Sequence, residues 1–132
     1  MKKDILIKKV TDIAIAIIPD EKDKNFGDVY FLNLKEIDLK SVFITSRGYG
    51  EIDGEKVETS QLRYSYELVG AKTAIKIEPI DAKLFQLANE YWISFNLDGF
   101  MYDKKYVFVP GSFIKENFTN VPLINKKGIM IK

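Results

Sequence analysis

The sequence predicts a mostly β protein, an antiparallel β-sandwich, and three observations support this prediction. Residues 91–97 and 100–109 alternate in polarity around Asp98-Gly99, a pair typical of a two-residue hairpin turn because both turn residues need positive φ. Seven or eight short segments with a period of two follow one another, separated by turn residues. The hydrophobic share of 46% and the aromatic share of 13% are those of a folded chain.

The predicted turn sets the register of the late hairpin. Leu97 then lies opposite Phe100 and Tyr91 opposite Tyr106, so one face is apolar and packs on a core. Trp92 falls on the other face beside Lys105. Lys104 falls on the apolar face, where a charge is costly, so we expect either a bulge nearby or an ammonium group that reaches out to water.

The N-terminal half begins with a strand over residues 10–18, in which both faces are apolar. Such a strand lies inside the structure or against another subunit. Strands over 28–35 and 41–46 follow, and the turn residues between them predict a second hairpin. The stretch 47–55 holds three glycines and predicts an exposed loop.

The middle of the chain continues the pattern. Polar residues alternate with Leu62, Tyr64, Tyr66 and Leu68, which predicts a strand with one face exposed to solvent. A strand over 75–78 ends at Pro79, since proline cannot donate to a ladder. Residues 81–89 are consistent with either a helical turn or a strand.

The last segment differs in character, so we expect one domain over 1–132, with a core at about 8–110 and a C-terminal extension at 111–132. Ser112 is placed to cap a short helix that ends at Asn117. Residues 121–124 and 129–131 then form a hairpin or a pair of edge strands. Their apolar residues need a partner surface, in the same domain or in a second copy.

Composition excludes several classes of function. With no cysteine and no histidine, the chain lacks disulfides, thiolate chemistry and the commonest general bases and zinc ligands. We expect no catalytic residue, no metal and no cofactor, because the acidic residues at 20–23 and 51–55 lack the spacing of a calcium loop. The 20 basic and 19 acidic residues are balanced, which predicts no overall attraction to membranes or nucleic acid.

The absence of cysteine fits the reducing cytoplasm. The apolar run at residues 5–7 is too short for a signal peptide, and the run at 13–19 is too short to span a bilayer. We therefore expect a cytoplasmic protein that does not bind membranes.

Five residues are candidates for contact with a partner. Arg47 and Tyr49 lie between glycines, where they present a planar cation and an aromatic ring. Trp92, Met101 and Lys105 gather on the outer side of the late hairpin. An exposed Trp92 makes an adhesive patch for protein or for unstacked bases, whereas a covering sheet or the stem of Lys105 on the ring explains it structurally.

Two resemblances add to these predictions. The order of Tyr30-Phe31-Leu32-Asn33-Leu34, a turn, Val42-Phe43-Ile44 and the late aromatic hairpin resembles immunoglobulin-like domains of bacterial proteins over about residues 8–110. This resemblance implies an immunoglobulin-like sandwich and carries no catalytic motif.

The whole chain is also similar to a small uncharacterised bacterial family, through stretches such as 45–51, 102–106 and 121–128. Some members are labelled phenylalanyl-tRNA synthetase β chain, a label that implies association with RNA. Synthetase β chains are several times longer, and none of their functional motifs is matched here, so no site residue is carried over.

Together these observations favour a non-catalytic module for protein–protein interaction or assembly, which binds a protein partner or a second copy through edge strands, the 47–50 loop or the tail. The alternative is an RNA-associated accessory domain, because aromatic residues are interleaved with lysines at 102–106 and because of the synthetase label in the similar family.

Overall fold

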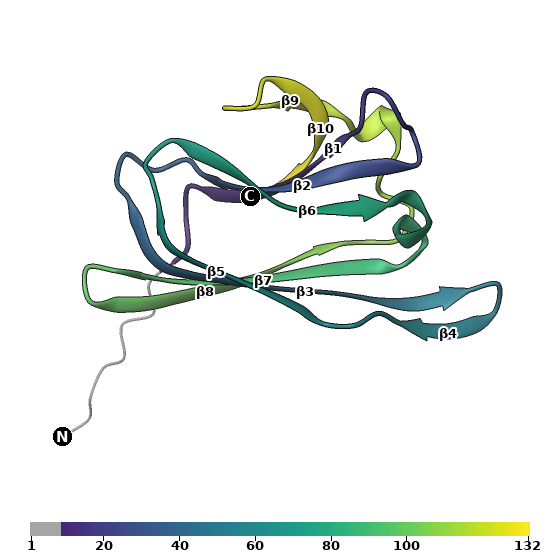
Figure 1. Ribbon diagram of the computed structural model, residues 1–132, viewed down its shortest axis with the longest axis horizontal. Helices are drawn as coiled ribbons and strands as arrows, with labels where there is room; N and C mark the ends of the chain where they lie inside the picture. The colour runs from purple at the N-terminus through teal and green to yellow at the C-terminus, as the bar shows by residue number, and fades with distance from the viewer. Residues whose placement is uncertain (1–8) are drawn as a thin grey trace.

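The computed structural model describes residues 9–132 and shows two antiparallel sheets packed face to face (Figure 1). Residues 1–8, which include the segment expected not to be a signal peptide, lie outside the described residues. The strands, in chain order, are β1 (Ile13–Pro19), β2 (Phe26–Asn33), β3 (Leu39–Ile52), β4 (Glu55–Glu58), β5 (Leu62–Val69), β6 (Thr73–Asp81), β7 (Ala88–Leu97), β8 (Phe100–Phe108), β9 (Thr119–Val121) and β10 (Lys126–Ile131). The β-sandwich prediction is confirmed at this level.

The first sheet has the order β6-β2-β1-β10-β9, with β1 at its centre. Residues 13–18 are all buried, as expected for a strand with two apolar faces. Ile15 lies in the core between the sheets, and Ala16 lies in a smaller cluster on the far side of the sheet, which includes Leu32 and Val121. The strand therefore lies inside this chain and does not need another subunit to cover it.

The second sheet is built on β3, the longest strand, which pairs with β7 along one edge and with β5 and β4 along the other. β7 pairs in turn with β8. Ser46 lies opposite Leu62 and Tyr49 opposite Glu58, so the outer strand carries one extra residue between β4 and β5. The hydroxyl of Thr59 accepts a hydrogen bond from the Gly48 N–H at 2.7 Å and holds this bulge.

The late hairpin has the predicted register from Leu97 opposite Phe100 back to Asn89 opposite Phe108. Asp98 and Gly99 adopt φ of 51° and 78°, as the turn requires. No register shift occurs at Lys104; its ammonium nitrogen lies 5.2 Å from the centre of the Tyr106 ring. The predicted bulge near Lys104 is therefore wrong. The ammonium group of this inward-facing lysine instead makes a cation–π contact with Tyr106.

Two predictions in the N-terminal half are wrong. Strands β2 and β3 do not form a hairpin, because both edges of β2 are already paired, with β1 and with β6. The chain crosses between the sheets here, and the buried Asn33 amide donates to the carbonyls of Ile37 and Gly70, both at 2.9 Å. The expected loop over 47–55 is strand up to Ile52, and the turn lies at Asp53-Gly54, with φ of 52° and 80°.

The two segments for which the sequence allowed a helical turn, 81–89 and 112–117, contain only short 3₁₀ turns. Residues Ala82–Gln86 form a 3₁₀ turn, η1, and β7 starts directly after it at Ala88. A second turn, η2, spans Lys115–Asn117 and begins after Ile114 without a side-chain cap, so Ser112 does not have the expected capping role.

The C-terminal segment is part of the first sheet. β10 pairs with β1 on one edge and with β9 on the other, so a hairpin is present. Its turn lies at 122–125, and the expected strand over 121–124 and turn over 125–128 are wrong. A Cβ at Gly128 would lie 2.4 Å from the Ile17 carbonyl oxygen and 2.7 Å from Ile18 Cδ1. Only glycine allows this close approach of backbones, so β10 completes the sheet instead of extending a finished domain.

Substitution Gly128→Ala should therefore destabilise the protein, because the new methyl group pushes β10 away from β1. We expect a loss of about 3 kcal/mol in the free energy of unfolding, measured by urea denaturation. Lys127→Ala, at an exposed neighbour, is the matched control and should change stability by less than about 0.5 kcal/mol. Equal stabilities of the two variants would contradict the packing role of Gly128.

Alkaline pH should destabilise the sandwich through Tyr106. Burial raises the pKa of Tyr106 to about 12, above the value of about 10 in an unfolded chain. The buried neutral hydroxyl of Tyr106 makes its full contribution to stability below the pKa of the unfolded state. This contribution is lost as pH rises through the pKa of the folded state. Urea denaturation across this range should show stability falling with pH, and Tyr106→Phe should reduce the slope by up to about 1.4 kcal/mol per pH unit. An unchanged slope would refute this.

Candidate functional site

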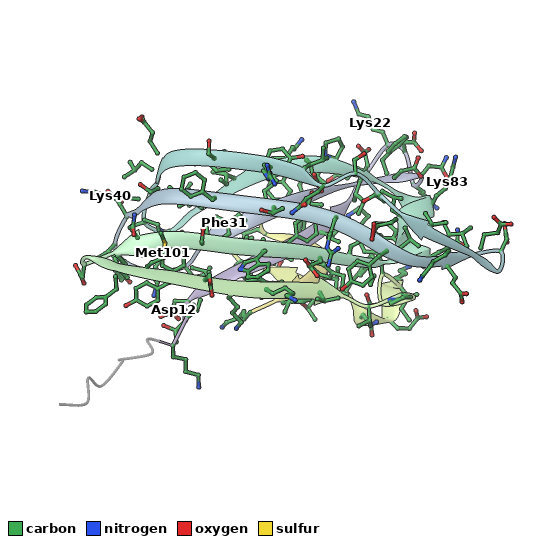
Figure 2. All side chains as sticks on the ribbon, turned by 90° about the horizontal axis from the view of Figure 1, so that it is seen from below. Asp12, Lys22, Phe31, Lys40, Lys83 and Met101 are labelled. Atoms are coloured by element: carbon green, nitrogen blue, oxygen red, sulfur yellow. The ribbon has the colours of Figure 1, made fainter. Side chains whose placement is uncertain are left out.

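The candidate site is the face of the second sheet that points away from the core, called the outer face below. Strict alternation places on it residues 43, 45, 47 and 49 of β3, the even residues 88–96 of β7 and the odd residues 101–107 of β8. All five residues singled out in the sequence lie on this face: Arg47, Tyr49, Trp92, Met101 and Lys105. In Figure 1 no described element lies beneath this sheet, and Figure 2 looks onto it.

The cross-strand register shows which side chains are neighbours. Trp92 lies opposite Thr45 on one side and Lys105 on the other. Thr45 also lies opposite Arg63 of β5, which brings the second of the two arginines onto this face. A row of Arg63, Thr45, Trp92 and Lys105 therefore crosses the whole sheet.

Large apolar side chains on this face are open to solvent. Their exposed fractions are 51% for Phe43, 46% for Trp92, 55% for Leu68 and 63% for Met101. Leu68 belongs to the row of Lys40, Asn96 and Met101, and Figure 2 shows Lys40 and Met101 toward the same end of the sheet. Several large apolar side chains on one uncovered face are typical of an interaction surface.

Leu68 was expected on the apolar inner face with Leu62, Tyr64 and Tyr66, and this expectation is wrong. Ser41 of β3 has φ of 51°, and the pairing of β3 with β7 shifts between Lys40 and Phe43. Beyond this irregularity Val69 is buried and Leu68 is exposed. The alternation in β5 alone contains no sign of the change, because its cause lies in the neighbouring strand.

Glu90 organises the polar part of the outer face. It is only 6% exposed, and its carboxylate accepts hydrogen bonds from Arg47 Nε at 3.2 Å and from the Tyr49 hydroxyl at 3.3 Å. Lys105 Nζ lies 3.9 Å from the same carboxylate. The guanidinium group of Arg47 also lies over the Tyr49 ring, 4.9 Å from its centre. One carboxylate thus holds three of the five predicted residues in place.

These contacts keep the groups in fixed protonation states. The hydrogen bond to Glu90 raises the pKa of Arg47, so this cation persists at any physiological pH. Burial, reinforced by the Glu90 charge, raises the pKa of Tyr49, so its hydroxyl remains a donor.

Lys105 links the charged and aromatic parts of the face. Its ammonium nitrogen lies 5.3 Å from the centre of the Trp92 ring while also approaching Glu90. The sequence predicted the stem of Lys105 on the ring, whereas the contact found is that of its ammonium group, and Trp92 remains 46% exposed. No second sheet covers Trp92 in the part of the chain that the structure describes.

The outer face continues into a hollow of about 810 Å³ at the β3–β4 hairpin. Arg47 and Tyr49 line its inner end, and Glu51, Lys56 and Glu58 line the rest together with the turn. Acidic and basic side chains are mixed here, whereas the large exposed apolar side chains lie on the flat part of the face. We therefore place the centre of the candidate site on the flat part, around Trp92.

Charge on the flat part has a small positive excess. The cations are Lys40, Arg47, Arg63 and Lys105, and the carboxylates are Glu67, Asp103 and Glu90, of which Glu90 is paired with Arg47. Such a surface attracts negatively charged partners although the whole chain is close to neutral. Within residues 9–132 no group of three or more His, Cys, Asp or Glu side chains is arranged to hold a metal ion.

Comparisons with known proteins add no relative. No protein-family model matches the chain, and no curated protein is similar to it in sequence. Among residues 9–132 the helical segments are too short and too polar to cross a bilayer.

Substitution Glu90→Gln should release Arg47, since the neutral amide no longer attracts the guanidinium group. The chain has only two arginines, so Arg47 and Arg63 give separate Nε–H signals in ¹⁵N NMR spectra, and Arg63 is an internal reference. We expect the Arg47 Nε–H to exchange with water several-fold faster in the variant, while Arg63 is unchanged. Asp103→Asn on the same face is the control, and equal exchange at Arg47 in both variants would show that Glu90 does not hold it.

Proposed function

We propose that this chain is a non-catalytic cytoplasmic module for protein–protein interaction, an immunoglobulin-like sandwich that binds an acidic, partly apolar segment of a partner protein on its outer face. The observation that supports this most is the row of Arg63, Trp92 and Lys105, with Phe43 and Arg47 beside it, on a sheet face that no described element covers.

The residue types fit a protein interface. Tryptophan, tyrosine and arginine are the residues that most often dominate binding energy, and methionine adapts to partners of different shape. Arg47 and Lys105 are already held by Glu90, so little side-chain entropy is lost when a partner binds between them. The surface is therefore organised before any partner arrives.

Charge indicates the chemistry of the partner. The flat part of the face carries one more positive than negative charge, since the four cations Lys40, Arg47, Arg63 and Lys105 stand with the three carboxylates Glu67, Glu90 and Asp103. A segment with aspartate or glutamate side chains would meet complementary charge, and its apolar residues would cover Phe43, Leu68, Trp92 and Met101. A basic segment would gain less from these charges.

The strand edges and the tail, the other surfaces considered from the sequence, are weaker candidates. The edge strand β8 carries an inward-facing charge at Lys104, a feature that discourages pairing with another strand. The tail supplies β10, which pairs along both of its edges within this chain.

Single-stranded RNA is the second candidate ligand. Trp92 lies in one cross-strand row with Arg63 and Lys105, so a base stacked on the indole would have cations on both sides for its phosphates. The resemblance of the sequence to proteins labelled as synthetase chains would imply the same kind of ligand. Binding of this kind weakens steeply with salt, because phosphate contacts release counterions.

The two candidates can be tested with fluorescent ligands, one a short Asp/Glu-rich peptide that carries leucine and phenylalanine, the other a single-stranded oligouridylate. We expect saturable binding of the peptide by fluorescence anisotropy. Trp92→Ala should weaken it at least tenfold, which corresponds to about 1.4 kcal/mol. Ile114→Ala removes a side chain of similar exposure, 45%, outside this face, and should have no effect.

Trp92 is the sole tryptophan, so its own fluorescence reports whether a ligand reaches this face. RNA binding that is lost in Trp92→Ala and falls steeply with salt would replace the protein-binding proposal by the second candidate. If neither ligand alters Trp92 fluorescence, or if both variants bind equally, the outer face is not the site.

A further inference from the structure

A second, separate pocket opens between the two sheets at the edge formed by β6. It has a volume of about 190 Å³. Its polar lining includes Ser46, Thr59, Glu78, Asn89 and Tyr91, and its apolar lining includes Leu62, Pro79, Ile80 and Leu84. The outer face and this pocket lie on opposite sides of β3, since Ser46 points inward and Arg47 outward.

Glu78 is the chemical centre of the pocket. It extends from β6 of the first sheet to three hydroxyl groups of the second sheet. Its Oε1 accepts hydrogen bonds from Ser46 Oγ at 3.1 Å and from the Tyr64 hydroxyl at 2.5 Å, and its Oε2 accepts one from the Tyr91 hydroxyl at 2.8 Å. A carboxylate offers about four acceptor positions, so Oε2 retains capacity for one more donor.

All three of these donors are neutral. Burial, together with the Glu78 charge, raises the pKa of Tyr64 and of Tyr91, so both hydroxyl groups stay protonated. Among residues 9–132 no lysine or arginine lies within 4.0 Å of the Glu78 carboxylate. Arg47 lines the pocket as well, but its guanidinium group is bound to Glu90 on the outer face.

A partly buried carboxylate without a cation is unusual, because charges in protein interiors are normally paired. The other polar groups of the pocket can also accept hydrogen bonds. The Asn89 amide nitrogen donates to the carbonyls of Leu84 and Leu87 at 2.8 and 3.2 Å. The Asn89 side-chain oxygen is therefore left as an acceptor, and it lies beside Gly48, 3.2 Å from the position that a Cβ would take there. The Tyr91 and Ser46 hydroxyls keep lone pairs after donating to Glu78.

This arrangement has the chemistry of a receptor for a small organic cation. A primary ammonium group brings one positive charge and three N–H donors, which match one carboxylate and several neutral acceptors. The apolar lining suits a short alkyl chain. The volume is well below the 300–1,000 Å³ typical of sites for drug-sized ligands, which suits a small ligand.

We propose that this pocket binds a primary alkylammonium group, supplied either by a free small amine or by a lysine side chain of a partner protein. Glu78 neutralises the charge, and Asn89, Ser46 and Tyr91 orient the ammonium group. Leu62, at the edge of the pocket, contacts the alkyl chain. This site is independent of the outer face and does not rest on the function proposed for it.

The test is a titration of the ¹⁵N-labelled full chain with putrescine or with Nα-acetyl-lysine amide, followed by NMR at the Gly48 and Thr59 amides and the Asn89 side-chain amide. We expect saturable shifts confined to the pocket. Stronger binding of putrescine indicates a free amine, and stronger binding of the lysine derivative indicates a partner side chain. Tetramethylammonium, which has no N–H group, is the control at equal ionic strength and should cause no saturable shift.

The variant Glu78→Gln removes the charge and keeps the shape, so it should weaken binding at least tenfold. Glu36→Gln removes an equal charge at an exposed site on the β2–β3 connection and should bind as the parent does. Leu62→Lys is the second variant, because Leu62 is 49% exposed and lies opposite Ser46. Its own ammonium group should occupy the pocket and block both ligands without loss of the fold.

The proposal is overturned if neither amine causes a saturable shift at Gly48, Thr59 and Asn89. It is also overturned if the folded Glu78→Gln or Leu62→Lys protein binds as tightly as the parent. In that case the three hydroxyl contacts of Glu78 serve only to hold the two sheets together.

Discussion

The pairing of β1 with β10 is the constraint on which the rest of the structure depends. β1 is apolar on both faces and buried along residues 13–18, so it needs a neighbour on each edge and cover on each side. β2 supplies one edge directly, whereas the other is filled only when the end of the chain returns, with Gly128 against Ile17. The first and last strands thus close the first sheet together, and the second sheet packs on it through the shared core.

Three polar side chains in low-exposure positions organise what surrounds that core. Asn33 ties the crossing between the sheets to the end of β5 through backbone carbonyls. Glu78 joins the first sheet to hydroxyl groups of the second, and Glu90 holds cations on the outer face. Each is satisfied by partners distant in sequence, so each selects one arrangement of strands. The two glutamates also create the two candidate binding sites, on opposite sides of β3.

Much of the candidate site was accessible from the sequence, because alternation around a known turn determines which side chains share a face. Trp92, Met101 and Lys105 lie together on the outer face, as the Asp98-Gly99 register predicted. Arg47 and Tyr49 were selected for a loop that does not exist, although the Asp53-Gly54 pair carries the same turn signal and marks the real end of β3. Arg63 and Leu68 were missed, since only the pairing of β3 with β5 brings them there, and Phe43 was missed because β3 joins this face through its pairing with β7.

The sequence by itself determined the local structure: a β-rich chain, most strand positions, the register of the late hairpin and a chemistry without thiols or imidazoles. Period-two alternation and turn residues act over a few positions, so they can be read from adjacent residues. The tertiary structure decided which sheet each strand joins, the return of β10 to β1 and the partners of Glu78 and Glu90. These depend on contacts between residues far apart in the chain, where the burial of whole faces outweighs local preference.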